Sequence, residues 1–282
     1  MDDVAFSREL LQTALERDSV GAQWRYALLG ALESPNAPRV CSTEDLARLV
    51  QMVRRNAAPA TIRAAITGLV VAKALFKISR GLYLNRRARP PVELAEAARH
   101  IRHGAVVSLE TVLGECGFLN NPAAIVTAVL PFRANCVPNV GAVQTSSGQV
   151  FRFSALPARF FPETPSQERK MLQAGRHVPM VKPEVAALHW LYLARSPRSS
   201  LKEAPQDVDF SVLDTDLLTE LAWEWDLARP LQEWIRKVEL TGDIQEPSEL
   251  PARSADVVQE SQAQGASAKA RLLARRRAHP QT

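Results

Sequence analysis

The hydrophobic pattern of the first third of the chain changes its period at Leu75, and few small folds accommodate such a change. From residue 59 to 74 the apolar side chains recur at the spacing of a helix that is buried on one face. From residue 75 to 84 they alternate with polar side chains, as in a half-buried strand pair. Ser79-Arg80-Gly81 has the composition of the turn between two such strands. The pattern therefore predicts a helix that passes directly into a β-hairpin.

Segments ahead of this helix also read as helical. Residues 2–17 and 23–32 form two candidate helices, and the proline-containing stretch 34–38 ends the second. A further helix is predicted to begin at Ser42, because a serine followed three residues later by a carboxylate is typical of a helix start.

Pro59 stands where the first turn of the last helix begins, a position at which its missing N–H costs nothing. The predicted order is thus helix, helix, short turn, helix and hairpin, which is the order of a winged helix-turn-helix. We predict this DNA-binding domain over residues 1–88.

Charge is distributed unevenly along the chain. The whole sequence has 35 Lys and Arg against 30 Asp and Glu, a net charge of +5. Residues 51–90, however, contain nine basic residues and no acidic one. A stretch of one sign inside foldable sequence indicates an anionic partner.

The basic stretch overlaps the predicted helix-turn-helix, so its side chains are candidates for DNA contacts. Arg63, near the start of the last helix, is placed to reach a base edge, and Thr61 is a candidate for a base or phosphate contact. Arg80, at the tip of the predicted wing, is also placed to enter a minor groove. Six candidates, Arg80 among them, are assigned to phosphates, which supply affinity but little sequence choice. They are Arg54, Arg55, Lys77, Arg80, Arg86 and Arg87.

The rest of the chain predicts a second domain and a tail. Residues 92–242 read as a mixed α/β domain closed by helices, so the fold class is α/β of the α+β kind. Strands are expected at 124–130, 150–156 and 178–181, and helices at 92–101, 108–116, 183–194, 214–228 and 231–240. Residues 243–282 are expected to be a disordered basic tail, in which 268–278 form either a transient basic helix or a solubilising end.

Several classes of protein are disfavoured by the sequence. No apolar stretch reaches 18 residues, and the acidic start lacks the features of a secretory signal, so no membrane association is expected. The three isolated cysteines, Cys41, Cys116 and Cys136, form no disulfide or zinc pattern and fit a reducing compartment. These observations predict a cytoplasmic protein.

No enzyme signature is present in the sequence. His100 and His103 are spaced like two metal ligands, but no further ligand completes a set nearby. A nuclease-like cluster is conceivable from three carboxylates and a lysine, although their spacing does not require it; these are Glu163, Glu168, Glu184 and Lys182. We predict no catalytic residue, no metal and no cofactor.

Other unusual side chains of the second domain are predicted to be structural. His189 falls in an apolar helix and is expected to be a core residue. Four tryptophans fall at apolar helical positions, and an exposed one would mark an interaction surface; they are Trp190, Trp223, Trp225 and Trp234.

Three stretches, taken in order, resemble the AbiEi-type antitoxins of bacterial abortive-infection (type IV) toxin–antitoxin systems. They are the hairpin 75–83, with its Arg-Gly-Leu-Tyr ending; Gly-Ala-Val-Val-Ser-Leu-Glu-Thr-Val-Leu at 104–113, followed by Gly117-Phe118-Leu119 and Pro122; and Val-Lys-Pro-Glu-Val-Ala-Ala-Leu at 181–188. The order and spacing match over about residues 40–195. The resemblance implies a winged helix that binds inverted repeats in its own promoter and represses the operon. It also implies an antitoxin domain that counteracts a nucleotidyltransferase toxin without requiring a stable complex.

Other functions remain open from the sequence. One is a winged-helix transcription factor whose second domain senses a ligand or mediates assembly, without a toxin partner. Another is a metal-dependent, nuclease-like enzyme. Neutralisation by direct toxin binding is a third possibility. Two copies are expected on an inverted repeat, whether or not the free protein is a dimer.

Overall fold

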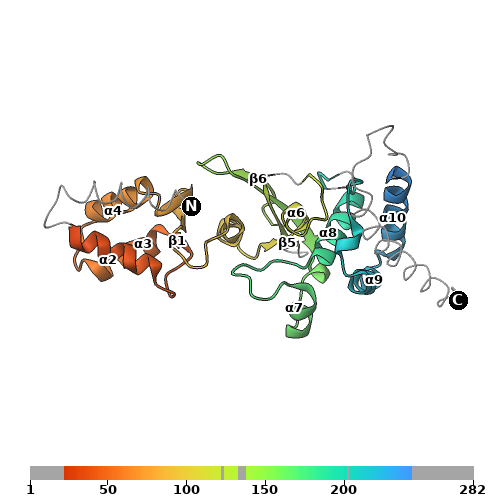
Figure 1. Ribbon diagram of the computed structural model, residues 1–282, viewed down its shortest axis with the longest axis horizontal. Helices are drawn as coiled ribbons and strands as arrows, with labels where there is room; N and C mark the ends of the chain where they lie inside the picture. The colour runs from red at the N-terminus through yellow and green to blue at the C-terminus, as the bar shows by residue number, and fades with distance from the viewer. Residues whose placement is uncertain (1–21, 122–123, 133–137, 198, 202, 243–282) are drawn as a thin grey trace, which may run out of the picture. The chain divides into compact units, whose positions relative to one another are not determined.

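The chain contains helices and two β-sheets, which confirms a mixed α/β class of the α+β kind (Figure 1). This computed structural model describes residues 22–121, 124–132, 138–197, 199–201 and 203–242. The predicted helix 2–17, Pro122, Cys136 and the predicted tail 243–282 lie outside the described residues. The chain divides into two compact units, of which the first runs to His103 and also takes in Ala142–Phe151.

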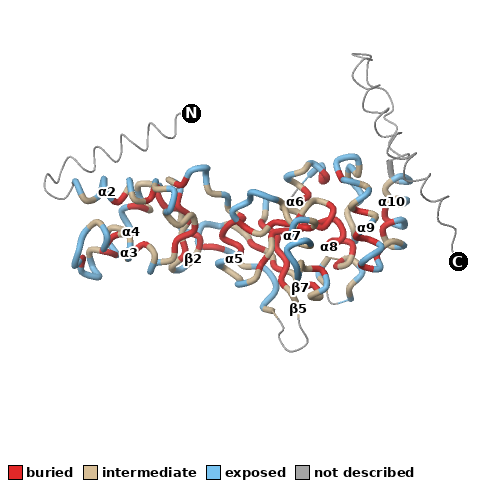
Figure 2. Tube along the Cα trace, turned by 90° about the horizontal axis from the view of Figure 1, so that it is seen from below, coloured by how far each residue is buried: buried red, intermediate tan, exposed pale blue. Residues whose placement is uncertain are grey.

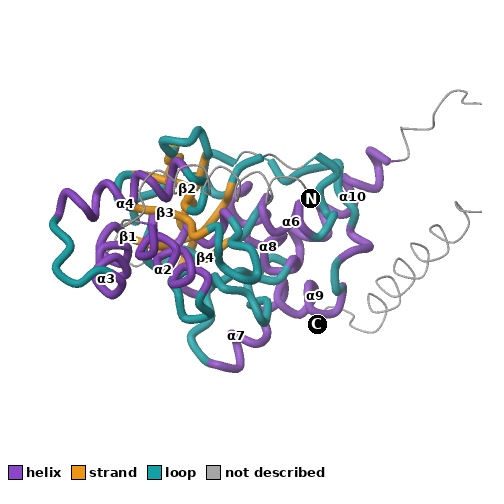
Figure 3. Tube along the Cα trace, turned by 60° about the vertical axis from the view of Figure 1, so that its left-hand side comes forward, coloured by secondary structure: helices purple, strands orange, loops and turns teal. Residues whose placement is uncertain are grey.

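Between residues 22 and 85, the first unit combines three helices with a three-stranded sheet. Its elements are α2 (Ala22–Glu33), β1 (Val40–Ser42), α3 (Thr43–Val53), α4 (Pro59–Val71), β2 (Leu75–Ser79) and β3 (Leu82–Asn85). The strand order is β1-β3-β2 with antiparallel pairing throughout, and Figure 3 shows the three strands side by side. The period change at Leu75 thus marks the passage from α4 into the hairpin.

Local signals in the sequence explain where the helices of this unit begin. The Ser42 side chain accepts a hydrogen bond from the backbone N–H of Asp45, and the Asp45 carboxylate accepts one from the Ser42 N–H at 2.9 Å. This reciprocal capping box satisfies two N–H groups that would otherwise lack partners. Pro59 occupies the first position of α4, as predicted.

The core of the first unit lies between its helices and its sheet. α2, α3, α4 and β2 all contribute buried side chains, among them Leu28, Leu32, Leu46, Val50, Ile62, Ile66, Leu69 and Leu75. Tyr83 of β3 is half-buried and packs against this cluster. Asn85 is fully buried, and its side-chain amide donates to the Leu32 carbonyl at 2.8 Å. This bond holds Asn85, the last residue of β3, against the end of α2.

In the part of the first unit that follows β3, an ion pair holds the segment around residue 96. The predicted helix 92–101 is wrong in detail, because a 3₁₀ turn, η1 (Leu94–Ala97), precedes the short α5 (Ala98–Ile101). Glu96 of η1 is 5% exposed and receives two 2.7 Å hydrogen bonds from the Arg39 guanidinium. Arg39 also donates to the carbonyls of Pro90 and Pro91.

The second unit contains most of the remaining strands and helices. Its strands are β4 (Val106–Val107), β5 (Val126–Phe132) and β7 (Val150–Pro157), and with β6 (Gly141–Gln144) they make a four-stranded sheet in the order β4-β5-β7-β6. Its helices are α6 (Glu110–Glu115), α7 (Pro165–Met171), α8 (Pro183–Arg195), α9 (Thr215–Glu224) and α10 (Ala228–Gly242), with 3₁₀ turns η2 (Ala158–Phe160) and η3 (Phe210–Val212). Helix α8 is buried along most of its length (Figure 2).

Three expectations for the second unit need correction. Ser108 does not cap α6, because Leu109 occupies that position with φ of 59° and the Ser108 hydroxyl faces His189 instead. The expected strand 178–181 makes only isolated bridges, through Met180 and Val181. The expected helix 214–228 ends at Glu224, since Asp226 takes a left-handed conformation (φ 59°) before α10 begins.

Candidate nucleic-acid interface

Helix α4 presents a face of small side chains with one cation. Ile62, Ile66 and Leu69 are buried, whereas Arg63 is exposed and Thr61 is half-buried. The other exposed residues of α4 are Pro59, Ala60, Ala64, Thr67, Gly68 and Val71. Arg63 is the one long side chain among these exposed residues of α4. Another surface can therefore approach this face of the helix closely.

The turn between α3 and α4 carries two exposed arginines. Arg54, at the end of α3, lies with its guanidinium 5.5 Å from the centre of the Trp24 ring, and Arg25 approaches the same ring at 5.7 Å. Arg55 is exposed beside it. The stacking with Trp24 orients Arg54 at a modest cost in side-chain freedom.

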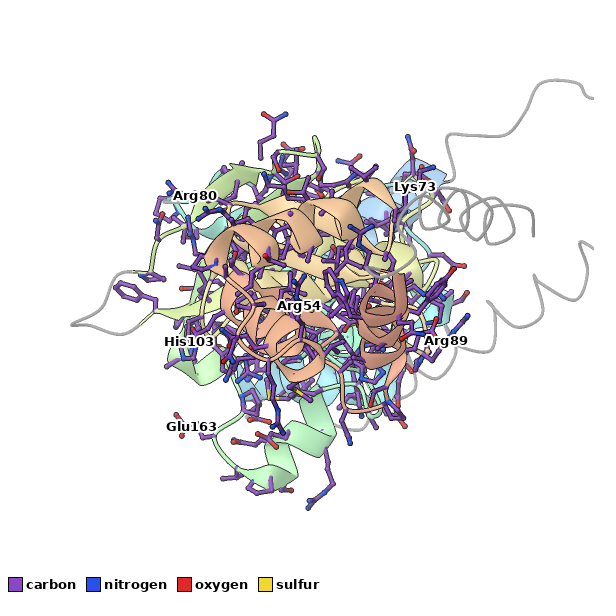
Figure 4. The ribbon with its side chains drawn as sticks, turned by 90° about the vertical axis from the view of Figure 1, so that its left-hand side faces the viewer. Arg54, Lys73, Arg80, Arg89, His103 and Glu163 are labelled. Carbon is purple, nitrogen blue, oxygen red and sulfur yellow. The ribbon has the colours of Figure 1, made fainter. Side chains whose placement is uncertain are left out.

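The β2–β3 hairpin places further cations on the same unit. Lys77 is exposed on β2, and Arg80 is exposed in the turn. The turn is held against the start of α3 by a hydrogen bond from the Thr43 N–H to the Gly81 carbonyl, 2.9 Å long. Gly81 has φ of 79°, a left-handed conformation that glycine adopts without strain. Figure 4 shows Arg80 and Lys73 on opposite sides of this unit, with Arg54 between them.

Arg86 and Arg87 are neighbours in the sequence but differ in their surroundings. The Arg86 guanidinium is exposed and lies 5.1 Å from the centre of the Phe76 ring. Arg87 is half-buried and forms an ion pair with Glu33 on α2. Arg87 is thus occupied within the protein, while Arg86 faces solvent.

Few acidic groups accompany these cations. Between residues 22 and 90 the acidic residues are Glu33, Glu44 and Asp45. Burial raises the pKa of Asp45, but hydrogen bonds from Ser42 and Arg48 outweigh it and lower that pKa below its usual value. Asp45 pairs with Arg48 and Glu33 pairs with Arg87, so neither carboxylate compensates the cations of α4 and of the hairpin turn.

A cavity of about 360 Å³ lies beside the hairpin, in the first unit. Its lining comes from the end of α4, from β2, from the residue after β3 and from the segment 142–151 that clusters with this unit. The lining residues are Val70, Lys73, Leu75, Phe76, Lys77, Arg86, Ser146 and Ser147. Lys73 belongs to the basic stretch, but the sequence alone does not single it out.

His189 is a core residue, as predicted. It is fully buried, with Nδ1 2.9 Å from the Ser108 hydroxyl and Nε2 3.2 Å from the Phe160 carbonyl. Because a carbonyl can only accept, Nε2 carries the proton and Ser108 donates to Nδ1. Its ring stacks on Trp225 with centroids 5.8 Å apart. Burial lowers the pKa of His189 to about 4, so the ring is neutral at pH 7.

The carboxylates of the suggested nuclease-like cluster have separate surroundings. Glu184 is buried and accepts a 2.8 Å hydrogen bond from the Asp214 N–H, whereas Glu163 and Glu168 are exposed. Within the described ranges, no three His, Cys, Asp or Glu side chains come together as a metal site. His100 and His103 are both exposed. Within those ranges, too, no helix is long and apolar enough to cross a bilayer.

The four tryptophans separate into two groups. Trp190, Trp225 and Trp234 are buried, as expected of core residues. Trp223, on the outer face of α9, is 69% exposed. Glu220 and Glu224 of the same helix pair with Lys170 of α7. Trp223 is thus a large exposed apolar side chain of the residue type that is enriched among the energetically dominant residues of interfaces.

Comparison with known proteins leaves the family of the chain open. No family model matches the chain, and no curated protein matches it. One solved structure that is similar is the crystal structure of the RV2827C protein from Mycobacterium tuberculosis. It is 14% identical, the match covers 83% of this chain and 87% of that chain, and the TM-score is 0.44. A likeness at this level assigns neither a family nor a function.

Proposed function

We propose that this protein is a DNA-binding autorepressor and antitoxin of the type IV kind, with a winged helix-turn-helix as its DNA-binding part. The observation that carries the proposal is the succession of α3, α4 and the β2–β3 hairpin, with exposed cations on each and no acidic residue from 51 to 90. Helix α4 takes the role of recognition helix, and the hairpin takes the role of wing.

Within this proposal the side chains divide by what they contact. Arg63 reads a base edge from α4, and the small residues around it allow the helix to lie deep in the major groove. Thr61 contacts a base or a phosphate. Arg54, Arg55 and Lys77 bind phosphates on either side. Arg80, at the hairpin tip, grips the flanking backbone or enters the minor groove.

The last two candidates, Arg86 and Arg87, have different roles in this proposal. Arg86 remains a phosphate ligand because it is exposed. Arg87 serves the fold through Glu33, and we assign it no DNA contact. Two copies on an inverted repeat would block polymerase by occupancy, and the second unit would counteract a nucleotidyltransferase toxin.

Changing Arg63, Lys77 and Arg80 together to Ala is expected to weaken binding to the protein's own promoter roughly a hundredfold. The slope of log affinity against log salt should also fall by about 0.9 for each of the two phosphate contacts, from Lys77 and Arg80. Fluorescence anisotropy with promoter DNA and with a scrambled duplex, at two salt concentrations, measures both quantities.

The matched control removes three exposed cations from the second unit, by R169A, R229A and R236A. It lowers the net charge by the same amount and should leave promoter selectivity intact. Equal losses in the two variants, or equal binding of wild type to both duplexes, would contradict a winged-helix repressor.

Replacing Trp223 by Ala is expected to reduce the rescue of toxin-expressing cells about tenfold, because an exposed tryptophan is the residue type that most often dominates an interface. The fold should be unaffected, since the side chain is 69% exposed. Plating efficiency measures rescue, and promoter binding by the same variant should stay unchanged. The control is Val212→Ala, which trims another exposed apolar side chain of the second unit; a similar loss there would rule out a special role for Trp223.

A further inference from the structure

The cavity beside the hairpin collects positive charge from three separate parts of the first unit. Lys73 follows α4, Lys77 lies on β2 and Arg86 follows β3, and all three are exposed side chains that line the cavity. No acidic residue lines it. Among the described residues, none of the three cations forms an ion pair. Their mutual repulsion is relieved when an anion binds between them.

The remaining lining gives the cavity a flat apolar wall and two serines. Phe76 is half-buried, and the Arg86 guanidinium lies over its ring, so the planar fork of Arg86 is oriented in advance. Ser146 and Ser147 also line the cavity, where the Ser146 hydroxyl donates to the Ile78 carbonyl and the Ser147 hydroxyl bonds the Thr145 hydroxyl. The Ser146 N–H donates to the Ile78 carbonyl at 3.2 Å, which keeps this segment against β2. The guanidinium fork of Arg86 and the two ammonium groups match the oxygens of a phosphate group.

Lys73 has a backbone conformation that a lysine adopts only at a cost. Its φ is 56°, in the left-handed region where a helix usually ends with glycine. Hydrogen bonds from the Lys73 N–H to Val70 and from the Ala74 N–H to Leu69 fix this ending at 3.0 and 2.9 Å. A residue that bears strain at the rim of a charged cavity is a candidate for function. Glycine would serve the fold equally well, but it would remove the cation.

We infer that this cavity binds the phosphate group of a phosphate ester. The cavity has a volume of about 360 Å³ and is open to solvent. The same phosphate chemistry has two sources, the backbone of DNA and a free nucleotide. With DNA as the source, the inference rests on the proposed repressor function, which already assigns Lys77 and Arg86 to phosphates. With a free nucleotide as the source it does not, because the nucleotide would occupy the site even if α4 never entered a groove.

The test uses Lys73→Gly in the full chain. This variant removes one cation from the cavity and relieves the left-handed backbone, so its melting temperature should equal or exceed that of the wild type. Arg89→Ala is the matched control, since Arg89 is an exposed cation of the same unit that does not line the cavity and lies apart from Lys73 in Figure 4. Adenosine monophosphate and inorganic phosphate are titrated by calorimetry, and a DNA duplex is titrated by anisotropy over a range of salt concentrations.

Two results support the site, and they separate the two sources. If K73G weakens adenosine monophosphate binding about tenfold and R89A does not, the cavity takes a free nucleotide. The other result is that neither the wild type nor either variant binds the nucleotide, whereas K73G, unlike R89A, lowers the salt slope of DNA binding by about 0.9. In that case the cavity takes a backbone phosphate. Equal effects of K73G and R89A, or no effect of K73G on any probe, would overturn the inference. Lys73 is not among the side chains to which the winged-helix proposal assigns DNA contacts, so the failure of either hypothesis can be distinguished from the failure of the other.

Discussion

Replacing Arg39 by Met should destabilise the first unit by about 3–5 kcal/mol, because it leaves the Glu96 carboxylate buried without its counter-charge. Glu96 is only 5% exposed, and the Arg39 side chain only 17%, so solvent screens the pair weakly. Two 2.7 Å hydrogen bonds join the guanidinium to the carboxylate in a fork. The substitution also removes the donors to the carbonyls of Pro90 and Pro91.

Native-state hydrogen exchange in α3 and β3 reports on this unit without interference from the other. Removing both charges, by R39M with E96Q, should recover much of the loss, since no unpaired charge then remains inside. Arg48→Met is the control, because its partner Asp45 is a surface neighbour and such pairs contribute below about 1 kcal/mol. A loss for R39M no larger than that for R48M would show that the Arg39–Glu96 pair does not hold the segment.

Acidification from pH 6.5 to pH 4 should destabilise the second unit by about 3 kcal/mol through His189 alone. Burial lowers the pKa of His189 to about 4 in the folded state, whereas an unfolded histidine titrates near 6.5. The unfolded chain therefore binds more protons in this window, and stability falls as the pH falls. At a pH well above 6.5 both states are neutral at this residue, and its contribution to the pH dependence vanishes.

Urea unfolding of the wild type and of His189→Gln at several pH values isolates this effect. Glutamine still offers a donor and an acceptor to Phe160 and Ser108, but it does not titrate. Between pH 4 and 6.5 the free energy of unfolding of the variant should depend less steeply on pH, because the contribution of His189 is gone. The contribution of the carboxylates to this pH dependence should stay the same. Parallel curves for the two proteins would refute a role for His189 in acid sensitivity.

Short-range signals in the sequence predicted the first unit well. Ser42 and Asp45 cap α3, Pro59 opens α4, and the hydrophobic period changes where the hairpin begins. Each of these signals acts within one turn of helix or one strand pair, so the residues that decide the structure are neighbours in the sequence. The fold follows these local preferences because the tertiary packing of this unit favours the same conformations.

Long-range partners were beyond the reach of the sequence. The Ser108 hydroxyl looked like a helix cap, but His189, 81 positions away, takes it instead. Arg39 meets Glu96 across 57 positions, a pairing that no local pattern of the sequence indicates. A polar side chain with a strong distant partner does not follow its local preference.

The candidate interface, too, depends on long-range partners that the sequence does not show. The sequence treated Arg86 and Arg87 alike, yet the ion pair with Glu33 sets Arg87 apart. Lys73 could not be singled out, because its significance comes from Lys77 and Arg86, which only the hairpin brings to the same cavity. The composition gives the number of cations, but it does not show which of them lie close together in the folded protein.

The fork between Arg39 and Glu96 also decides how the chain can be dissected. A fragment that stops at residue 90 keeps every strand of the β1-β3-β2 sheet, yet it discards Glu96 and leaves Arg39 without its carboxylate partner. Such a fragment should be poorly expressed and quickly proteolysed, although it spans the whole helix-and-hairpin pattern. The minimal autonomous module is therefore longer than its recognisable motif, and its C-terminal limit lies beyond η1.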